Sequence, residues 1–174
     1  MVSENKFVGV GVGSNFRRAL HISRGLKLLK RKFGLIKISN VYKCDDISEH
    51  GEFYWNLAIL FLSDLSCHKI KQELKLIEGC CGRLKDDKNN GTATLDLDIL
   101  ATVESGLIKM FPGAISADFG ANNLHIFFPL QELLPEWEFW ETDFQKYKDS
   151  IFCVFDHRAK SNDGQRANQR KCTC

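Results

Sequence analysis

The 174-residue sequence lacks an apolar run long enough to cross a membrane as a helix. Its longest such stretch, Leu57 to Leu62, is far shorter than the roughly 20 residues that a bilayer requires. The segment Met1 to Lys6 also lacks the apolar core of a secretory signal peptide. We therefore expect a cytoplasmic protein.

The seven cysteines lack any spacing typical of a zinc site, and the five histidines stand apart from them. In a chain without a secretion signal, cysteines are expected to be reduced thiols. The cysteine pattern therefore favours neither a disulfide-stapled secreted domain nor a structural metal–thiolate site.

The chain also lacks a strong excess of one charge, because its formal net charge is only +2. Length and composition are those of one globular domain, and we place that domain at residues 1–157. The remaining segment, 158–174, is basic and poor in large apolar residues, so a disordered tail is predicted. A nucleic-acid role for this tail is less favoured than a solvated tail.

The spacing of apolar residues predicts the order of helices and strands. Strands are expected over 6–12, 35–42, 53–62, 94–102 and 107–110, and helices over 16–33 and 66–81. A helix interrupted at Pro129 is expected over 123–134, and a final helix running into a strand over 142–155. Ser14 or Asn15 is expected to cap the first helix, and Gly34 to end it.

The order β-α-β-β-α-β predicts an α+β sandwich of the ferredoxin-like, split βαβ kind, with helices packed on an antiparallel sheet. The glycines Gly9, Gly11 and Gly13 precede a helix and suggest a dinucleotide-binding fingerprint. Their spacing does not fit that motif, and no acidic residue ends the second strand. A dinucleotide site is therefore disfavoured.

Residues 92–100 read T-A-T-L-D-L-D-I-L. Strand side chains alternate between faces, so Leu95 and Leu97 share one face while Asp96 and Asp98 share the other. Two neighbouring carboxylates repel each other unless a cation lies between them. From these residues alone, a solvated acidic strand is favoured over a metal site.

Several separated motifs occur together in one order along the chain. They are Gly13-Ser14-Asn15, Tyr54-Trp55-Asn56, Glu78 with Gly82-Arg83, the hexad Thr94-Leu95-Asp96-Leu97-Asp98-Ile99, Phe128-Pro129-Leu130 and Leu134-Pro135-Glu136. In this order and spacing, residues 6–137 resemble 6-hydroxymethyl-7,8-dihydropterin pyrophosphokinase of folate biosynthesis. The hexad is the most specific piece, and the resemblance makes a metal site the favoured interpretation of its aspartates.

The resemblance implies transfer of pyrophosphate from ATP to the hydroxymethyl group of 6-hydroxymethyl-7,8-dihydropterin. It implies two magnesium ions held by Asp96 and Asp98, which would neutralise charge on the phosphates. Arg83 would join these aspartates in catalysis. The partners implied are therefore the pterin and ATP, for a monomer that binds neither a membrane nor nucleic acid.

The resemblance also implies a set of binding residues. The amide of Asn56 would bind the ring edge of the pterin, since an amide both donates and accepts hydrogen bonds. Tyr54 would stack on one side of the ring, and His125, with Phe127 close by, on the other. Glu78 and Lys85 are the nucleotide-binding residues that it implies. Without the resemblance, a structural role, with Tyr54 a packed aromatic of a strand and Asn56 a turn amide, is as favoured as a binding role.

The chain departs from the family pattern in its phosphate-binding cations. In the loop 82–92, Asp86 and Asn90 stand where an arginine and a tryptophan are expected, and Ala93 replaces another arginine. We expect this polar loop to accept Ala93→Arg without a packing penalty, and the variant to release AMP faster.

Two alternatives follow from these departures. Either other cations take over the missing contacts, with candidates Arg17, Arg18, Lys88 and Lys109, or the chain is a non-catalytic homologue that binds pterin or nucleotide. A third hypothesis, from another class, is a nucleic-acid-binding domain on the same scaffold. It is the least favoured, because the central strands show no run of exposed aromatics.

Overall fold

The computed structural model describes residues 5–34, 37–44, 53–84, 91–105, 107–110, 124–135 and 152–155. Its elements are β1 (Lys6–Ser14), α1 (Arg18–Phe33), β2 (Lys37–Ile38), β3 (Val41–Cys44), β4 (Tyr54–Ser63), α2 (Cys67–Cys80), β5 (Asp96–Glu104), β6 (Leu107–Met110), α3 (Leu124–Leu133) and β7 (Phe152–Phe155). None of the described helices is long and apolar enough to span a membrane.

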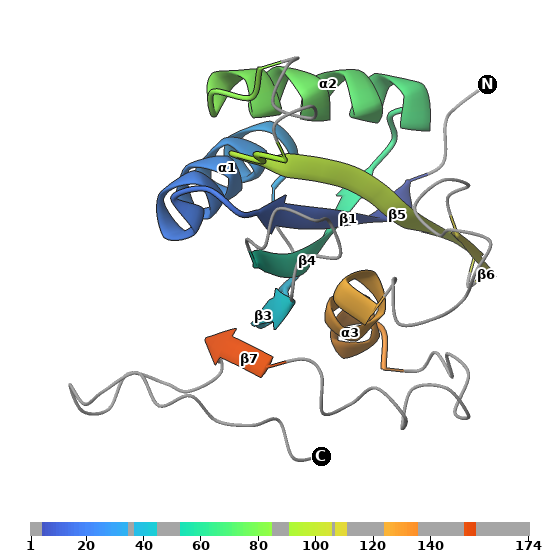
Figure 1. Cartoon of the computed structure of the whole chain (residues 1–174). Helices are drawn as coiled ribbons and strands as arrows, with labels where there is room; N and C mark the ends of the chain where they lie inside the picture. The colour runs from blue at the N-terminus through green and yellow to red at the C-terminus, as the bar shows by residue number, and fades with distance from the viewer. Residues whose placement is uncertain are drawn as a thin grey trace, which may run out of the picture.

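The strands form one antiparallel sheet in the order β6-β5-β1-β4-β3-β7, and β2 also pairs with β4. Helices α1 and α2 lie on one side of this sheet and α3 lies on the other (Figure 1). The predicted α+β class and antiparallel sheet are therefore confirmed.

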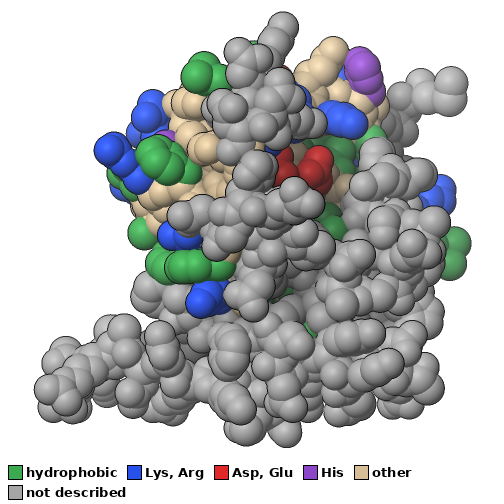
Figure 2. Space-filling view, viewed as in Figure 1, with side chains coloured by type: hydrophobic (Ala, Val, Ile, Leu, Met, Phe, Trp, Pro, Cys, Tyr) green, Lys and Arg blue, Asp and Glu red, His purple; other side chains and the backbone are tan. Residues whose placement is uncertain are grey.

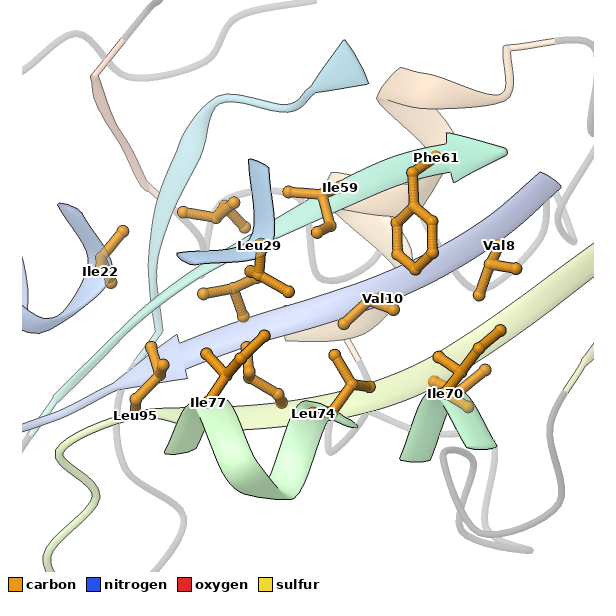
Figure 3. Close-up of a cluster of buried hydrophobic side chains, with 14 of the residues drawn as sticks. Val8, Val10, Ile22, Leu29, Ile59, Phe61, Ile70, Leu74, Ile77 and Leu95 are labelled. Carbon is orange, nitrogen blue, oxygen red and sulfur yellow. The ribbon is translucent and has the colours of Figure 1, made fainter. Parts of the chain in front are cut away.

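The main hydrophobic core lies between the sheet and the helices α1 and α2 (Figure 3). Alternate residues of β1, β4 and β5 face this core because strand side chains alternate. The buried residues include Val8, Val10, Val12, Leu57, Ile59, Phe61, Leu95, Leu97, Ile22, Leu29, Ile70, Leu74 and Ile77. Each large side chain of this kind contributes about 1.5–3 kcal/mol of stability by leaving water.

The two long helices begin in different ways. Ser66 caps α2, because its hydroxyl accepts a hydrogen bond from the backbone N–H of Lys69 (3.3 Å). Helix α1 begins after Arg17, which has a positive φ of 42° and makes no side-chain cap bond. The prediction that Ser14 or Asn15 caps α1 is therefore wrong, because both side chains bind another segment. Gly34 ends α1 as predicted, with a φ of 70°.

Two other predicted elements differ from the structure. The strand expected over 35–42 is divided into β2 and β3 at Ser39 and Asn40, where the Ser39 N–H donates to the carbonyl of Ala58 (2.9 Å) and the Ser39 hydroxyl accepts the N–H of Ala58 (2.8 Å). Helix α3 continues through Pro129, so the interruption predicted there is wrong. Leu130 and Leu133 of this helix are buried against the sheet, which stabilises the helix despite the proline.

The turn between β5 and β6 and the strand β7 agree with the predictions. The helix expected before β7 and the basic tail 158–174 lie outside the described residues.

Helix α3 is held to the second face by apolar contacts and one carboxylate. Leu130 and Leu133 pack with Ala58, Leu60, Leu100 and Ala101. Glu132 accepts hydrogen bonds from the backbone N–H of Asn40 (2.8 Å) and the hydroxyl of Tyr42 (3.0 Å). Helix α3 therefore covers only part of this face. The part near the start of β5 carries polar side chains.

The alternate glycines of β1 make room on the α3 side of the sheet. A Cβ atom at Gly9 would lie 3.1 Å from Leu130 Cδ1, and one at Gly11 would lie 3.2 Å from Leu100 Cδ2. Both positions therefore admit a leucine side chain where any larger residue would crowd it. This packing accounts for two of the three glycines that suggested a dinucleotide fingerprint.

Candidate functional site

The third glycine, Gly13, lies between polar side chains of the two neighbouring strands. It pairs with Asn56 of β4 on one side and with Asp96 of β5 on the other. Paired residues of neighbouring strands share a face, so Asn56 and Asp96 flank Gly13. A Cβ atom at Gly13 would lie 2.9 Å from Asn56 Oδ1, 3.8 Å from Tyr54 Cδ1 and 3.9 Å from Asp96 Cβ. The fold thus brings together the predicted residues Tyr54, Asn56 and Asp96.

The two aspartates lie on one face of β5, as the alternation predicted. Leu95 and Leu97 are buried in the main core, whereas Asp96 is half-buried and Asp98 is exposed. Asp98 pairs with Gly11, so no side chain from β1 stands beside its carboxylate. Acidic side chains reach the surface over this part of the sheet (Figure 2).

Arg83 supplies a positive charge beside the aspartates. Its Nη2 lies 3.4 Å from Asp96 Oδ1, and its Nη1 donates a hydrogen bond to the carbonyl oxygen of Leu95 (3.4 Å). The Arg83 side chain is only 13% exposed, so water screens this ion pair less than one on the open surface. The structure therefore places this predicted catalytic residue in contact with Asp96.

Glu78 is buried beside β5 and is bound by protein groups. One of its oxygens accepts the backbone N–H of Leu97 (2.8 Å), and both accept from Lys75 Nζ (2.8 and 2.9 Å). Burial raises the pKa of the Glu78 carboxyl, and the nearby Asp96 raises it further, while the bonds from Lys75 and Leu97 lower it. These contacts stabilise the edge of β5, and the nucleotide-binding role of Glu78 stays a prediction.

The residues present suit a magnesium ion that is bound mainly through its substrate. Among the described residues, no group of three or more His, Cys, Asp or Glu side chains is arranged to bind a metal ion. Magnesium typically uses one or two carboxylates together with substrate phosphates and water. Asp96 and Asp98 offer such a pair on one accessible face, so the donor set fits.

Ala93 is buried, although the sequence analysis assigned it to a polar loop. It is only 2% exposed, and its backbone N–H and carbonyl both bond to Asn15. The expectation that the loop accepts Ala93→Arg without a packing penalty is therefore wrong, because the new side chain would start from a buried position.

Arg18 is used differently from the phosphate-binding role suggested for it. Its Nε donates to the carbonyl oxygen of Phe53 (2.8 Å), and its guanidinium lies 3.7 Å from the centre of the Phe53 ring. Lys43 Nζ lies 4.2 Å from the same ring. The aromatic ring therefore holds two cations beside Tyr54, a cluster that the sequence analysis missed because its members are far apart in the chain.

Some predicted site residues are not tested by the structure. His125 and Phe127 belong to α3, but their side chains lie outside the described atoms. Lys85 lies in 85–90, which is also outside the described residues, as are Asp86, Lys88 and Asn90. The roles proposed for His125, Phe127, Lys85 and Lys88 stay predictions.

A comparison with protein families decides the assignment. The model of the family "7,8-dihydro-6-hydroxymethylpterin-pyrophosphokinase (HPPK)" matches residues 9–146. The chain belongs to this family. Pterin pyrophosphokinases are transferases of folate biosynthesis that act on a pterin and use ATP as co-substrate. The matched segment contains Tyr54, Asn56, Arg83 and both aspartates. A search of the curated proteins found no match.

Proposed function

We propose that this chain transfers the pyrophosphoryl group of ATP to the hydroxymethyl group of 6-hydroxymethyl-7,8-dihydropterin. The observation that carries the proposal is the convergence of Tyr54, Asn56 and Asp96 on Gly13, with Arg83 in contact with Asp96. A group suited to bind a planar polar ring thus lies directly beside a group suited to bind charged phosphates.

We also assign the fold to the ferredoxin-like class. The central strands follow the order β5-β1-β4-β3, and α1 and α2 lie on one side of the sheet. This is the order that two interleaved βαβ units produce in an antiparallel sheet. The additional strands β6 and β7 extend its two edges, and α3 covers part of the second face.

The pterin would be bound at the Tyr54 and Asn56 side of the site. The Asn56 side chain is buried over the bare backbone of Gly13, so its amide is held in place and can pair with the polar edge of the ring. The half-buried Tyr54 offers its ring for stacking. His125 and Phe127 are proposed for the opposite side of the pterin ring.

The phosphates would be bound at the Asp96 and Asp98 side. These carboxylates would hold magnesium, which when bound supplies positive charge against the phosphates. Arg83 adds a fixed cation at the same place, where negative charge grows during transfer. The pterin hydroxyl oxygen forms a bond to the β-phosphorus, the bond from that phosphorus to the α–β bridging oxygen breaks, and AMP leaves. The hydroxyl proton passes to solvent.

The direct test is an assay of AMP release that requires both ATP and 6-hydroxymethyl-7,8-dihydropterin. We expect pterin-dependent AMP release, with one pterin pyrophosphate formed for each AMP. A protein that binds the pterin in calorimetry but releases no AMP would instead be the non-catalytic homologue. A protein that binds neither compound would contradict both assignments.

A second experiment tests the metal-binding role of the aspartates. The double variant Asp96→Asn with Asp98→Asn should lose magnesium-dependent ATP binding while it keeps its fold, because neither side chain belongs to the core. Glu104→Gln is the matched control, since Glu104 lies on the same strand at its other end and pairs with Lys6 (3.9 Å). Equal ATP affinity of the double variant and the control, measured by calorimetry with magnesium, would exclude this role.

A further inference from the structure

The residues that follow Gly13 are bonded to the segment before β5, beyond the last paired residues of β1 and β5. The register of the two strands runs from Phe7 with Val103 to Gly13 with Asp96. The next residue, Ser14, is completely buried, and its hydroxyl lies 2.8 Å from the carbonyl oxygen of Thr94. The same hydroxyl is also within reach of the carbonyls of Ala93 (3.3 Å) and Phe16 (3.1 Å).

Asn15 binds the same segment with its backbone and its side chain together. Its backbone N–H donates to the carbonyl of Ala93 (3.0 Å), and its side-chain Oδ1 accepts the N–H of Ala93 (2.6 Å). Its Nδ2 donates to the carbonyl of Gly91 (2.6 Å). The carboxamide thus pairs as a neighbouring peptide group of a strand would, with one donor and one acceptor. Asn15 is buried, so these bonds are costly to lose.

The segment that Ser14 and Asn15 hold leads directly into β5, the strand that carries Asp96 and Asp98. Residues 91–94 lie between the loop 85–90 and β5, and Asp96 follows Thr94 by two residues. Only Leu95 separates this segment from β5, so a displacement of residues 91–94 also displaces the first side chains of the strand. The place of the Asp96 carboxylate relative to Gly13 and Asn56 therefore depends on how residues 91–94 are held.

We infer that Ser14 and Asn15 are positioning residues, which fix residues 91–94 to β1 and thereby set the place of Asp96. This Ser14–Asn15 clamp replaces the helix-capping role that the sequence predicted for these residues. Its consequence for ligand binding rests on the proposed function, whereas its consequence for the backbone does not.

The test uses the full chain with three variants. Asn15→Ala removes both side-chain bonds, and Asn15→Asp keeps the acceptor for the Ala93 N–H but loses the donor to Gly91. Ser39→Ala is the matched control for loss of buried hydrogen bonds, since the Ser39 hydroxyl also bonds two backbone groups, at Ala58 and Asn40, elsewhere in the sheet. Amide hydrogen exchange, the affinity for ATP with magnesium, and kcat and KM for ATP are measured for each.

In Asn15→Ala we expect exchange at the Ala93 amide to rise about tenfold or more, as for loss of a buried hydrogen bond. Exchange at Asp96 and Leu97 should rise with it, while the amide of Ile59 in β4 should keep its protection. The affinity for ATP with magnesium should fall about tenfold, and Asn15→Asp should also lose affinity, because its buried carboxylate would face the carbonyl oxygen of Gly91. Ser39→Ala should change neither the exchange of residues 93–97 nor the ATP affinity.

Unchanged exchange at Ala93 in Asn15→Ala would show that no clamp exists. If Asn15→Ala shows faster exchange at Ala93 but binds ATP as tightly as Ser39→Ala does, the clamp is structural and does not position Asp96. If the wild-type chain binds neither ATP nor pterin, the proposed function fails by itself. Amide exchange at Asp96 and Leu97 then still tests the inference. If these amides are as well protected in Asn15→Ala as in Ser39→Ala, the inference is wrong.

Discussion

The two faces of the central strand β1 show how one strand can serve both a core and a site. Val8, Val10 and Val12 face α1 and α2, and each is almost completely buried. The residues between and after them, Gly9, Gly11 and Gly13, face the side of α3. The first face is filled by the strand's own side chains, whereas the second is filled by side chains from elsewhere.

What fills the second face changes along the strand. Leu130 occupies the space over Gly9, Leu100 the space over Gly11, and the amide of Asn56 the space over Gly13. The face is therefore apolar at one end and polar at the other. Because glycine contributes no side chain of its own, the polar end remains open to groups from β4 and β5.

The largest effect is expected on the helix-covered face. Leu74→Ala should lower the free energy of unfolding by about 2–5 kcal/mol, because it leaves a cavity in a closely packed core. Leu76→Ala on the same helix is the control, since Leu76 is 65% exposed and should cost far less. Chemical denaturation of both variants measures the difference, and similar losses would mean that α2 does not pack as described.

The next effect concerns the segment that enters the site. Ala93→Arg should lower the free energy of unfolding by about 1–3 kcal/mol, because the buried position must accept a larger, charged side chain. We expect no faster release of AMP. A variant of wild-type stability that releases AMP faster would show that the segment can turn this side chain outward.

A smaller and more local effect is expected from Gly13→Ala. The added methyl group would lie 2.9 Å from Asn56 Oδ1, so the amide must move from the place where we propose that it binds the pterin edge. Pterin affinity should fall about tenfold, which corresponds to about 1.4 kcal/mol. Gly79→Ala is the matched control, because its methyl group would meet no atom within 4 Å. Equal pterin titrations of the two variants would place the ring elsewhere.

The smallest effect expected is the contribution of Glu78, which lies on the helix-covered side, to the pH dependence of stability. Burial raises the folded-state pKa of this carboxyl above its usual value of 4.5, so the folded state holds the proton more tightly. Its contribution to stability is therefore fully present below pH 4.5 and is lost as the pH rises through the folded pKa.

Glu78→Gln removes this titration but keeps an acceptor for the N–H of Leu97. The stability of the variant relative to wild type should therefore increase as the pH rises through the folded pKa. Denaturation at a series of pH values measures this difference, and a constant difference would show that the Glu78 pKa is not raised in the folded state.

The sequence predicted those features that depend on local periodicity. The alternation of leucine and aspartate in residues 95–98 placed the carboxylates on the face away from the core, because strand side chains alternate whatever their neighbours are. The apolar spacing of residues 66–81 likewise predicted α2, whose buried apolar residues are Ile70, Leu74 and Ile77. Residue types at fixed spacing were sufficient for both.

Other local signals were misleading because tertiary contacts replaced the expected partner. Ser14 and Asn15 are common helix-capping residues, but their side chains bond to residues 91–94, which lie 76 to 80 positions away in the chain. Ala93 belongs to a polar stretch and is nevertheless buried by those bonds. Pro129 suggested a break in α3, yet the packing of Leu130 and Leu133 maintains the helix.

The sequence by itself determined that two carboxylates share one face of a strand, and the family match places that strand in a member of the pterin pyrophosphokinase family. Only the tertiary structure decided the register of β1 against β4 and β5, in which Gly13 separates Asn56 from Asp96. The physical reason is that strand register depends on burying the faces of all the elements together. The spacing of residues along the chain does not specify which side chains of the neighbouring strands will lie beside a glycine.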